Sequence, residues 1–117
     1  LHDVIDFATS YGKPVIQAEA GIDSVLGETG FDFGEKRAAD YHGKLQEVFY
    51  RAAGDGRIQG MAIFVLHDYP APIKFNRKQR GYNRKGLLTE KLEKKPVFEK
   101  VKEGFARLAQ QTRGAAK

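Results

Sequence analysis

The sequence contains no cysteine, no tryptophan and only one methionine among its 117 residues. The absence of cysteine excludes disulfide bonds, a thiolate metal site and a cysteine nucleophile. No apolar run reaches the length of a transmembrane helix, and no segment has the pattern of a secretory signal peptide. A chain of this length can bury a hydrophobic core, so we expect at most one globular domain.

The length also excludes some complete folds. A full eight-stranded α/β barrel needs about 250 residues, more than the chain provides. The sequence opens with Leu1 in place of methionine, inside what the spacing predicts to be a helix. We therefore expect a piece of a longer protein, in which residues 1–111 form the folded segment and residues 112–117 a flexible tail.

Positive charge is concentrated in one part of the chain. The formal net charge is +5, yet residues 74–100 alone contain ten lysines and arginines against three glutamates. Such a block indicates either an anionic partner or a solvated surface.

Helical and strand patterns alternate along the chain. Apolar residues recur at helical spacing in three segments, and two short apolar runs between them are typical of the buried strands of a parallel sheet. The expected elements are a helix at 2–11, a strand at 15–19, a helix at 35–53, a strand at 58–66 and a helix that begins at Lys95-Pro96. Long loops fill 20–34 and 70–86. This order predicts an α/β fold with two parallel strands.

The same spacing predicts which helix faces are buried. The expected stripe of the 35–53 helix is Ala38, Tyr41, Leu45, Val48, Phe49 and Ala52, and that of the last helix is Val97, Val101, Phe105 and Leu108. We expect His2 and His42 to be surface or helix-face residues.

Glu19 closes the first apolar run. An ionised carboxylate is costly to bury without a partner, which disfavours a role in the core. In α/β barrels the carboxyl ends of the strands carry the chemistry, so Glu19 is a candidate catalytic carboxylate, with a solvated loop glutamate as the alternative. His67 and Asp68 follow the second strand in the same way. They are candidates to line a site, and a structural hydrogen-bonded pair is the alternative; Asp23 is a loop solubiliser or orients the loop after Glu19.

Several stretches, taken in order, resemble one known family. They are KPVIQAEAGID at 13–23, EVFYR at 47–51, IFVLHDY at 63–69, NRKGLLT at 83–89 and KKP at 94–96. In this order and spacing they resemble the last quarter of the catalytic barrel of glycoside hydrolase family 2, which contains β-glucuronidases and β-galactosidases. The resemblance covers residues 2–107. It implies the C-terminal portion of a TIM (β/α)8 barrel, with the first strand as the seventh of the barrel and the second as the eighth.

The resemblance also implies roles for four residues. By it, Glu19 is the nucleophile, which attacks the anomeric carbon and forms a covalent glycosyl-enzyme that water then hydrolyses. Phe64 falls where the family has an aromatic residue beneath the substrate. Asn83 and Lys85 match the Asn-x-Lys motif by which β-glucuronidases hold the sugar's carboxylate. The reaction needs no cofactor, and we expect no metal site, because no His, Asp and Glu cluster has ligand spacing.

The sequence departs from the family pattern in three respects. Ala20 replaces the usual aromatic residue after the nucleophile, and Phe64 replaces a tryptophan, so the sugar specificity stays open. The Asn-Glu pair that supplies the acid/base in this clan does not occur in the 117 residues. Retaining hydrolysis needs two carboxyl groups about 5–5.5 Å apart, so we expect the chain to be inactive by itself.

Three alternatives remain beside the β-glucuronidase interpretation. A clan relative such as a β-galactosidase would take a neutral sugar. The basic and aromatic residues of 74–86 also match a small nucleic-acid-binding module, which is the weaker interpretation. The third alternative is a non-catalytic partial barrel that folds only through self-association, because two parallel strands leave open edges that favour a homo-oligomer. The expected partner is a carbohydrate substrate, and we expect no membrane partner.

Overall fold

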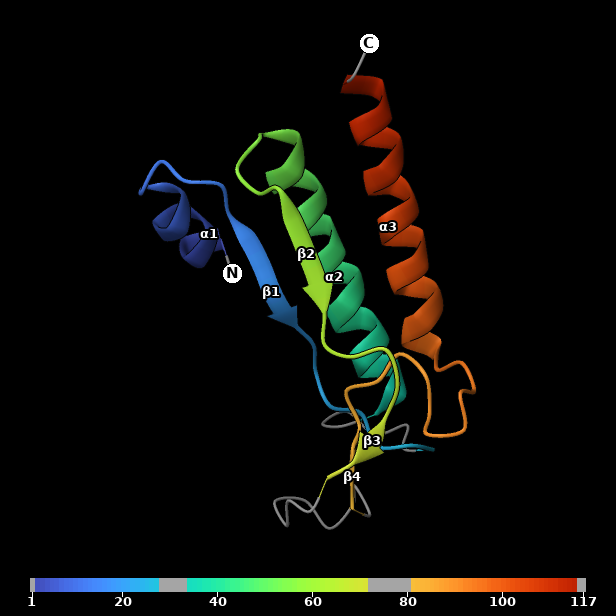
Figure 1. Ribbon diagram of the computed structural model, residues 1–117. Helices are drawn as coiled ribbons and strands as arrows, with labels where there is room; N and C mark the ends of the chain where they lie inside the picture. The colour runs from blue at the N-terminus through green and yellow to red at the C-terminus, as the bar shows by residue number, and fades with distance from the viewer. Residues whose placement is uncertain (1, 28–33, 72–80, 116–117) are drawn as a thin grey trace.

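A computed structural model of the chain describes residues 2–27, 34–71 and 81–115 (Figure 1). Its helices are α1 (His2–Thr9), α2 (Glu35–Gly54) and α3 (Pro96–Ala115), and its strands are β1 (Ile16–Ala20), β2 (Gly60–Ile63), β3 (Tyr69–Pro70) and β4 (Tyr82–Asn83). The molecule measures 47 × 27 × 23 Å. The helices α2 and α3, each about 30 Å long, supply the larger part of its long dimension.

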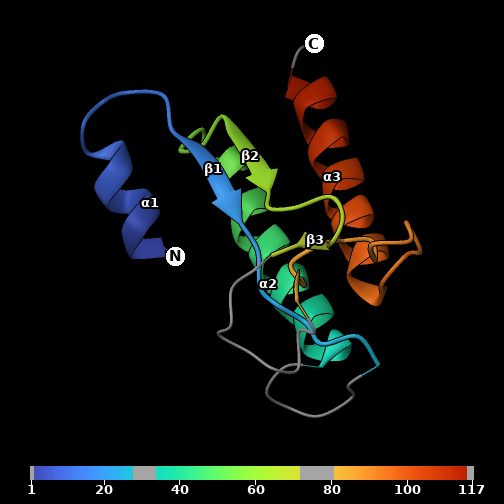
Figure 2. The ribbon, with the colours of Figure 1, turned by 60° about the horizontal axis from the view of Figure 1, so that its bottom comes forward.

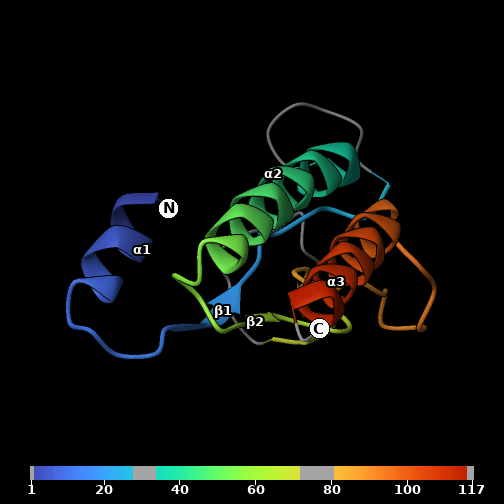
Figure 3. The same cartoon turned by 90° about the horizontal axis from the view of Figure 1, so that it is seen from above.

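The strands β1 and β2 form a parallel pair that is connected through α2. Their register pairs Ile16 with Gly60 and Ala20 with Ile63, with an irregularity between. Figure 2 shows the two strands in front of α2, and Figure 3 shows α2 and α3 on the same face of the strands. The predicted α/β class with parallel strands is confirmed, since parallel neighbours need such a crossover.

Two hydrophobic clusters hold the helices against the strands. The first consists of Ile5, Leu45, Phe49, Ala52 and Ile58, and the second consists of Ala39, Leu87, Val97 and Val101. Phe49 is 1% exposed and Ala52 is fully buried. The predicted stripe of α2 is therefore confirmed at these two positions and at Leu45, and that of α3 at Val97 and Val101.

The second strand is shorter than the sequence predicts. The apolar run suggests a strand over 58–66, whereas β2 has four residues. The chain makes its last hydrogen bond to β1 from the amide of Phe64, at 3.0 Å. Residues 65–68 then pair with residues 85–88 instead. An apolar run indicates that a segment is prone to form a strand, but it does not indicate where the partner strand ends.

The outer face of β1 also differs from the expectation of a buried strand. Ile16 is 67% exposed, and Ala18 and Glu19 are exposed as well. Figure 3 shows the helices on one face of the strands, and around β1 it is Val15 and Ala20 that pack against the first cluster. The prediction that β1 is buried is therefore wrong in this structure.

The buried face of α2 is rotated relative to the predicted stripe. Tyr41 is 38% exposed, whereas His42, which we expected at the surface or on a helix face, is only 1% exposed. The cause is the position of α3, which approaches α2 at Gly104. A β-carbon on Gly104 would lie 2.4 Å from the side chain of Gln46, so the glycine makes room for that side chain. Phe105 is 40% exposed where the sequence predicts burial, although it lines an apolar pocket with residues of α2 and β2.

The helix ends agree only in part with the sequence prediction. The segment from Gly54 to Gly56 ends α2 as predicted, and Gly56 has a φ of +69° that favours glycine. α1 ends at Thr9, before its predicted limit. α3 continues to Ala115, so residues 112–115 are helical where the sequence predicts a tail. The side chain of His2 and residues 116–117 lie outside the described residues.

The burial of His42 predicts a stability that depends on pH. Desolvation lowers the pKa of His42 below its ordinary value of 6.5, and its Nδ1 atom has no partner among the described residues. Between the folded and unfolded pKa values, the unfolded chain binds a proton at this residue and the folded chain does not. The free energy of unfolding should therefore decrease as the pH falls below about 6.5, by at most about 1.4 kcal/mol per pH unit.

Urea denaturation at several pH values between about 7.5 and 5 checks this prediction. His42→Gln should flatten the dependence in that window, because glutamine does not titrate. His67→Gln is the matched control, since His67 is exposed. An equal pH dependence in the parent chain and in His42→Gln would contradict the prediction.

Candidate functional site

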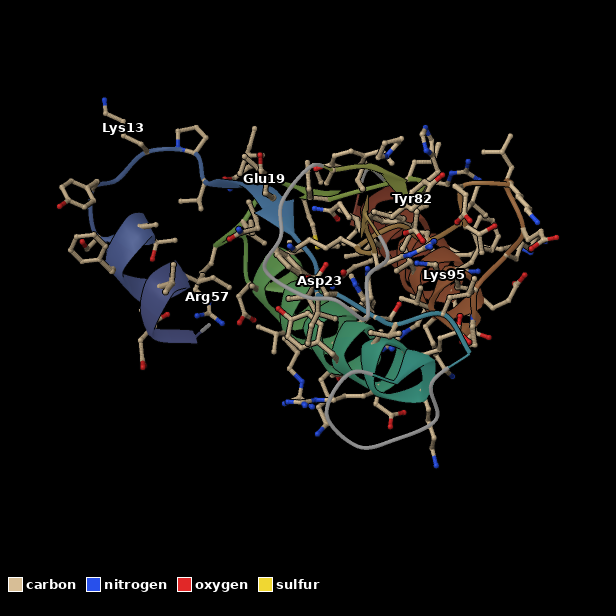
Figure 4. All side chains as sticks on the ribbon, turned by 90° about the horizontal axis from the view of Figure 1, so that it is seen from below. Lys13, Glu19, Asp23, Arg57, Tyr82 and Lys95 are labelled. Atoms are coloured by element: carbon tan, nitrogen blue, oxygen red, sulfur yellow. The ribbon has the colours of Figure 1, made fainter. Side chains whose placement is uncertain are left out.

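Glu19 lies at the carboxyl end of β1. Its side chain is exposed to solvent, and its backbone carbonyl accepts a hydrogen bond from Nε2 of Gln17 at 2.6 Å. Figure 4 views the molecule from the end toward which both strands run, and it labels Glu19 beside the arrow of β1. The contacts of Gly21 and Lys85 show which segments meet near this strand end.

Gly21 brings the ends of β1 and β2 together. A β-carbon on this glycine would lie 2.1 Å from the carbonyl oxygen of Phe64 and 4.0 Å from Cδ of Lys85. The backbone two residues after Glu19 thus packs against Phe64 and beside the lysine that the sequence analysis selected.

Replacing Gly21 with alanine should destabilise the chain, because the new methyl group would meet a backbone atom that cannot rotate away. We expect the free energy of unfolding to fall by about 1–3 kcal/mol. The matched control is Gly43→Ala in the middle of α2, where no described atom lies within 4 Å of the new β-carbon. There alanine should stabilise the helix by about 1 kcal/mol. Urea denaturation measures both changes, and a Gly21→Ala chain as stable as its parent would contradict the close approach.

The segment after β4 lies alongside the chain that leaves β2. The amide of Val65 donates to the carbonyl of Lys85 at 3.4 Å, and the amide of Leu87 donates to the carbonyl of Val65 at 3.0 Å. The Phe64–Val65 peptide is cis. Within the segment, Oδ1 of Asn83 accepts a hydrogen bond from the amide of Lys85 at 3.0 Å. This local turn fixes Asn83 and Lys85 relative to each other.

Two aromatic rings and a histidine lie near this segment. The half-buried ring of Phe64 meets that of Tyr69 edge to face, with 6.2 Å between the ring centroids. The side chain of His67 is exposed, and its Nδ1 atom lies 2.8 Å from the backbone carbonyl of Asp68. The ring of His67 is therefore oriented by the backbone and stays accessible to solvent.

Lys85 forms an ion pair with Asp23. Its Nζ atom lies 3.2 Å from Oδ2 of Asp23, and both side chains are 32% exposed. The second oxygen of Asp23 is buried and has no hydrogen-bond partner among the described residues. The ion pair connects the loop after Glu19 to the segment after β4, in agreement with the orienting role that the sequence offered for Asp23.

Asp68 lies at the centre of what we call the buried charge cluster, formed by the buried Asp68, Arg84 and Lys95 and by Glu90, which is 25% exposed. Its side chain is 0% exposed, and Oδ1 accepts hydrogen bonds from Nζ of Lys95 at 2.6 Å and from the amide of Gly86 at 2.9 Å. Oδ2 accepts a hydrogen bond from Nη1 of Arg84 at 2.9 Å, and Arg84 also pairs with Glu90. These contacts give Asp68 a structural role, but its partners are Arg84, Gly86 and Lys95 and not the side chain of His67, with which the sequence predicted a hydrogen-bonded pair.

The buried charge cluster keeps Arg84 and Glu90 ionised. Burial alone would lower the pKa of Arg84, but its hydrogen bonds to Asp68 and Glu90 outweigh burial and raise that pKa above its ordinary value. A hydrogen bond to its own backbone and then the bond from Arg84 lower the pKa of Glu90. Two carboxylates therefore balance the two cations Arg84 and Lys95.

The sequence pattern indicates Asp68 but not its partners. Arg84, Glu90 and Lys95 belong to the charged block at 74–100, which the pattern describes only as basic. Pro96 marks the start of α3, but no spacing shows that Lys95 points inward while Lys94 stays exposed. In the sequence, the signal that points to this cluster is the position of Asp68 directly after a predicted strand.

Part of the basic loop lies outside the described residues. Residues 72–80, which include Phe75 and four basic residues, belong to that part. The nucleic-acid interpretation of the loop stays a prediction. Within the described ranges, no three His, Asp or Glu side chains lie close enough to share a metal ion. No helix in those ranges is long and apolar enough to cross a membrane.

The fold was compared with known proteins. No family model and no curated protein matches the sequence. Among solved structures, the β-glucuronidase of Bifidobacterium dentium, complexed with coumarin-3-O-glucuronide, is 26% identical with a TM-score of 0.75, over 90% of this chain and 16% of that one. A β-galacturonidase of glycoside hydrolase family 2 from Eisenbergiella tayi, bound to galacturonate, is 21% identical with a TM-score of 0.71, over 89% of this chain and 20% of that one.

A third solved structure matches a larger share of this chain. The β-glucuronidase of Dictyoglomus thermophilum is 20% identical with a TM-score of 0.66, over 95% of this chain and 18% of that one. The chain thus spans about a fifth or less of the length of these structures. The matches bear out the resemblance drawn from the motifs: in fold, this chain is similar to a segment of the glycoside hydrolase family 2 β-glucuronidases and β-galacturonidases.

Proposed function

We propose that this chain is the C-terminal part of the (β/α)8 barrel of a retaining β-glycosidase of the β-glucuronidase type. In this assignment β1 is the seventh strand of the barrel, β2 the eighth and α2 the helix between them. The parallel pairing of the two strands supports the assignment, as does the similarity to the B. dentium enzyme over 90% of the chain.

Glu19 is the proposed nucleophile. Its carboxylate is exposed at the carboxyl end of β1, where a barrel places its chemistry. It would attack the anomeric carbon and expel the aglycone, and water would then release the sugar from the covalent intermediate. The acid/base would come from another part of the barrel, since the sequence contains no Asn-Glu pair. Residues 1–117 alone are then expected to bind a sugar without hydrolysing it.

Lys85 and Asn83 are the proposed partners of a sugar carboxylate. The single observation that carries this proposal is the position of Lys85. Its side chain lies beside Gly21, two residues after Glu19, and its ammonium already holds the carboxylate of Asp23 in a partly exposed pair. An ammonium held in this way can also bind the carboxylate of a uronic acid by a charge-assisted hydrogen bond.

Three further residues complete the proposed site. Phe64 would offer an apolar surface to the sugar ring, supported by its packing against Tyr69. The exposed ring of His67 would lie at the rim. Asp68 would act through its neighbours, because its own oxygens face the interior.

Covalent trapping tests the proposal. The natural protein that carries this segment is incubated with a 2-deoxy-2-fluoro-β-glucuronide that bears a good leaving group, because the fluorine slows hydrolysis of the intermediate. Mass spectrometry of the digested protein should find the fluorosugar on the peptide that contains Glu19. The variant Asp55→Asn, which alters an exposed carboxylate beyond α2, serves as a positive control.

Two outcomes would count against parts of the proposal. An adduct on another carboxylate would contradict the role of Glu19. An adduct formed by the corresponding fluorogalactoside but not by the fluoroglucuronide would contradict recognition of a uronic acid and favour the neutral-sugar alternative.

A further inference from the structure

The bonds of Asp68 converge on one short segment of the chain. Its carboxylate receives the side chain of Arg84 and the backbone amide of Gly86, both at 2.9 Å. These are the two residues on either side of Lys85. The third bond, from Nζ of Lys95, reaches the same carboxylate, and that ammonium also donates to the backbone carbonyl of Arg84 at 3.2 Å.

The loop after Glu19 also holds the segment. The amide of Ser24 donates to the carbonyl of Arg84 at 3.1 Å, and Ser24 follows Asp23, which pairs with Lys85. The backbone of Lys85 is therefore held on both sides, while its own side chain remains 32% exposed. The buried groups fix the backbone from which the Lys85 side chain extends. The side chain itself stays partly exposed, so a ligand can reach its ammonium.

The charges of the cluster do not explain anion binding by themselves. Asp68 and Glu90 balance Arg84 and Lys95, so the buried cluster carries no net charge to attract a sugar carboxylate. Removal of the Asp68 charge would leave a net positive cluster beneath the site. By electrostatics alone, this change would strengthen the binding of an anion.

We propose that Asp68 is a positioning residue for Lys85, and that it thereby sets the preference of the site for a sugar with a carboxylate over a neutral sugar. This inference rests on the proposed function, in which Lys85 meets that carboxylate. In this proposal the buried side chain of Asp68 anchors the 83–86 segment through its bonds to Arg84 and Gly86, the neighbours of Lys85.

The test compares two substrates in the natural protein that carries this segment. The ratio of kcat/KM for a β-glucuronide to that for the β-galactoside with the same leaving group is measured in the parent protein and in Asp68→Asn. Loss of positioning should lower this ratio by about tenfold or more, mainly because KM for the glucuronide rises. A change of this size is what the loss of one hydrogen bond to a charged group produces. Asp55→Asn, at an exposed carboxylate, should leave the ratio unchanged.

A second variant and a second measurement accompany Asp68→Asn. A β-carbon at Gly86 would meet the backbone nitrogen of Asp68 and the backbone carbon of His67 as well as Oδ1 of Asp68, so Gly86→Ala displaces the Asp68 backbone together with its carboxylate, without a change of charge. It should lower the same ratio. Hydrogen exchange of the 117-residue chain supplies a readout without ligand, since the amides of 83–86 should exchange faster in either variant.

The outcomes separate the two proposals. A lower ratio together with faster exchange at 83–86 supports the positioning role. An unchanged or higher ratio, an equal loss for both substrates, or unchanged exchange at 83–86 overturns it. A parent protein that shows no preference for the glucuronide overturns the uronic-acid function itself, and the hydrogen exchange of 83–86 then still reports whether Asp68 anchors the segment.

Discussion

Replacing Glu19 with glutamine in the natural protein should reduce the turnover of a β-glucuronide by about four orders of magnitude or more, which is the scale seen when catalytic groups are removed. The amide keeps the size and exposure of the side chain but cannot form the glycosyl ester. The thermal stability should stay close to that of the parent, because the Glu19 side chain is exposed at the end of β1. Steady-state kinetics with a chromogenic glucuronide measures the loss.

An added nucleophile provides the control for Glu19. In Glu19→Gly, azide can enter the space of the missing carboxylate, attack the anomeric carbon and expel the aglycone, which leaves a glycosyl azide of inverted configuration. Asp55→Asn should retain full turnover and gain nothing from azide. Glu19→Gln with turnover near that of the parent would contradict the assignment of the nucleophile.

Replacing Asp68 with alanine should produce the largest loss of stability among the substitutions considered. It leaves Arg84 and Lys95, 6% and 1% exposed at their side chains, without the carboxylate that both of them contact. Removal of one partner from a buried ion pair costs about 3–5 kcal/mol, because an uncompensated charge remains buried. Urea denaturation of the 117-residue chain measures the change in the free energy of unfolding.

The matched control for Asp68 is an exposed ion pair of the same length. Asp6 lies 2.6 Å from Arg57, yet the side chain of Asp6 is 61% exposed. Asp6→Ala should therefore cost less than about 1 kcal/mol. If Asp68→Ala and Asp6→Ala lower the free energy of unfolding equally, burial of the cluster does not determine its contribution to stability. The comparison holds the length of the ion pair constant and varies its exposure.

The sequence predicts where the helices and strands lie along the chain better than it predicts which of them pack against each other. Helical spacing locates α2 and identifies Leu45, Phe49 and Ala52 as buried, because these residues meet the core whichever neighbour covers the rest of the helix. It does not predict that His42 is buried and Tyr41 exposed. That result depends on where α3 crosses α2, and the crossing is set by the space at Gly104.

The same limit applies to the candidate site. The sequence predicts an exposed Glu19 at the end of a strand, because a charged residue there is costly to bury, and the structure has it so; its role in a site stays a prediction. The buried charge cluster is not recognisable, because Asp68 meets partners 16 and 27 residues away. In the sequence these partners are members of a basic block. Only the fold separates the buried Lys95 from the exposed Lys94.

The arrangement around Lys85 has an evolutionary consequence. Its neighbours Arg84 and Gly86 carry the contacts that hold the segment, whereas the Lys85 side chain contributes one partly exposed ion pair. Position 85 can therefore change at little cost in stability, while positions 84 and 86 cannot. Under the proposed function, descendants of such a chain would exchange one sugar for another by a substitution at residue 85, while selection for stability would act on positions 84 and 86.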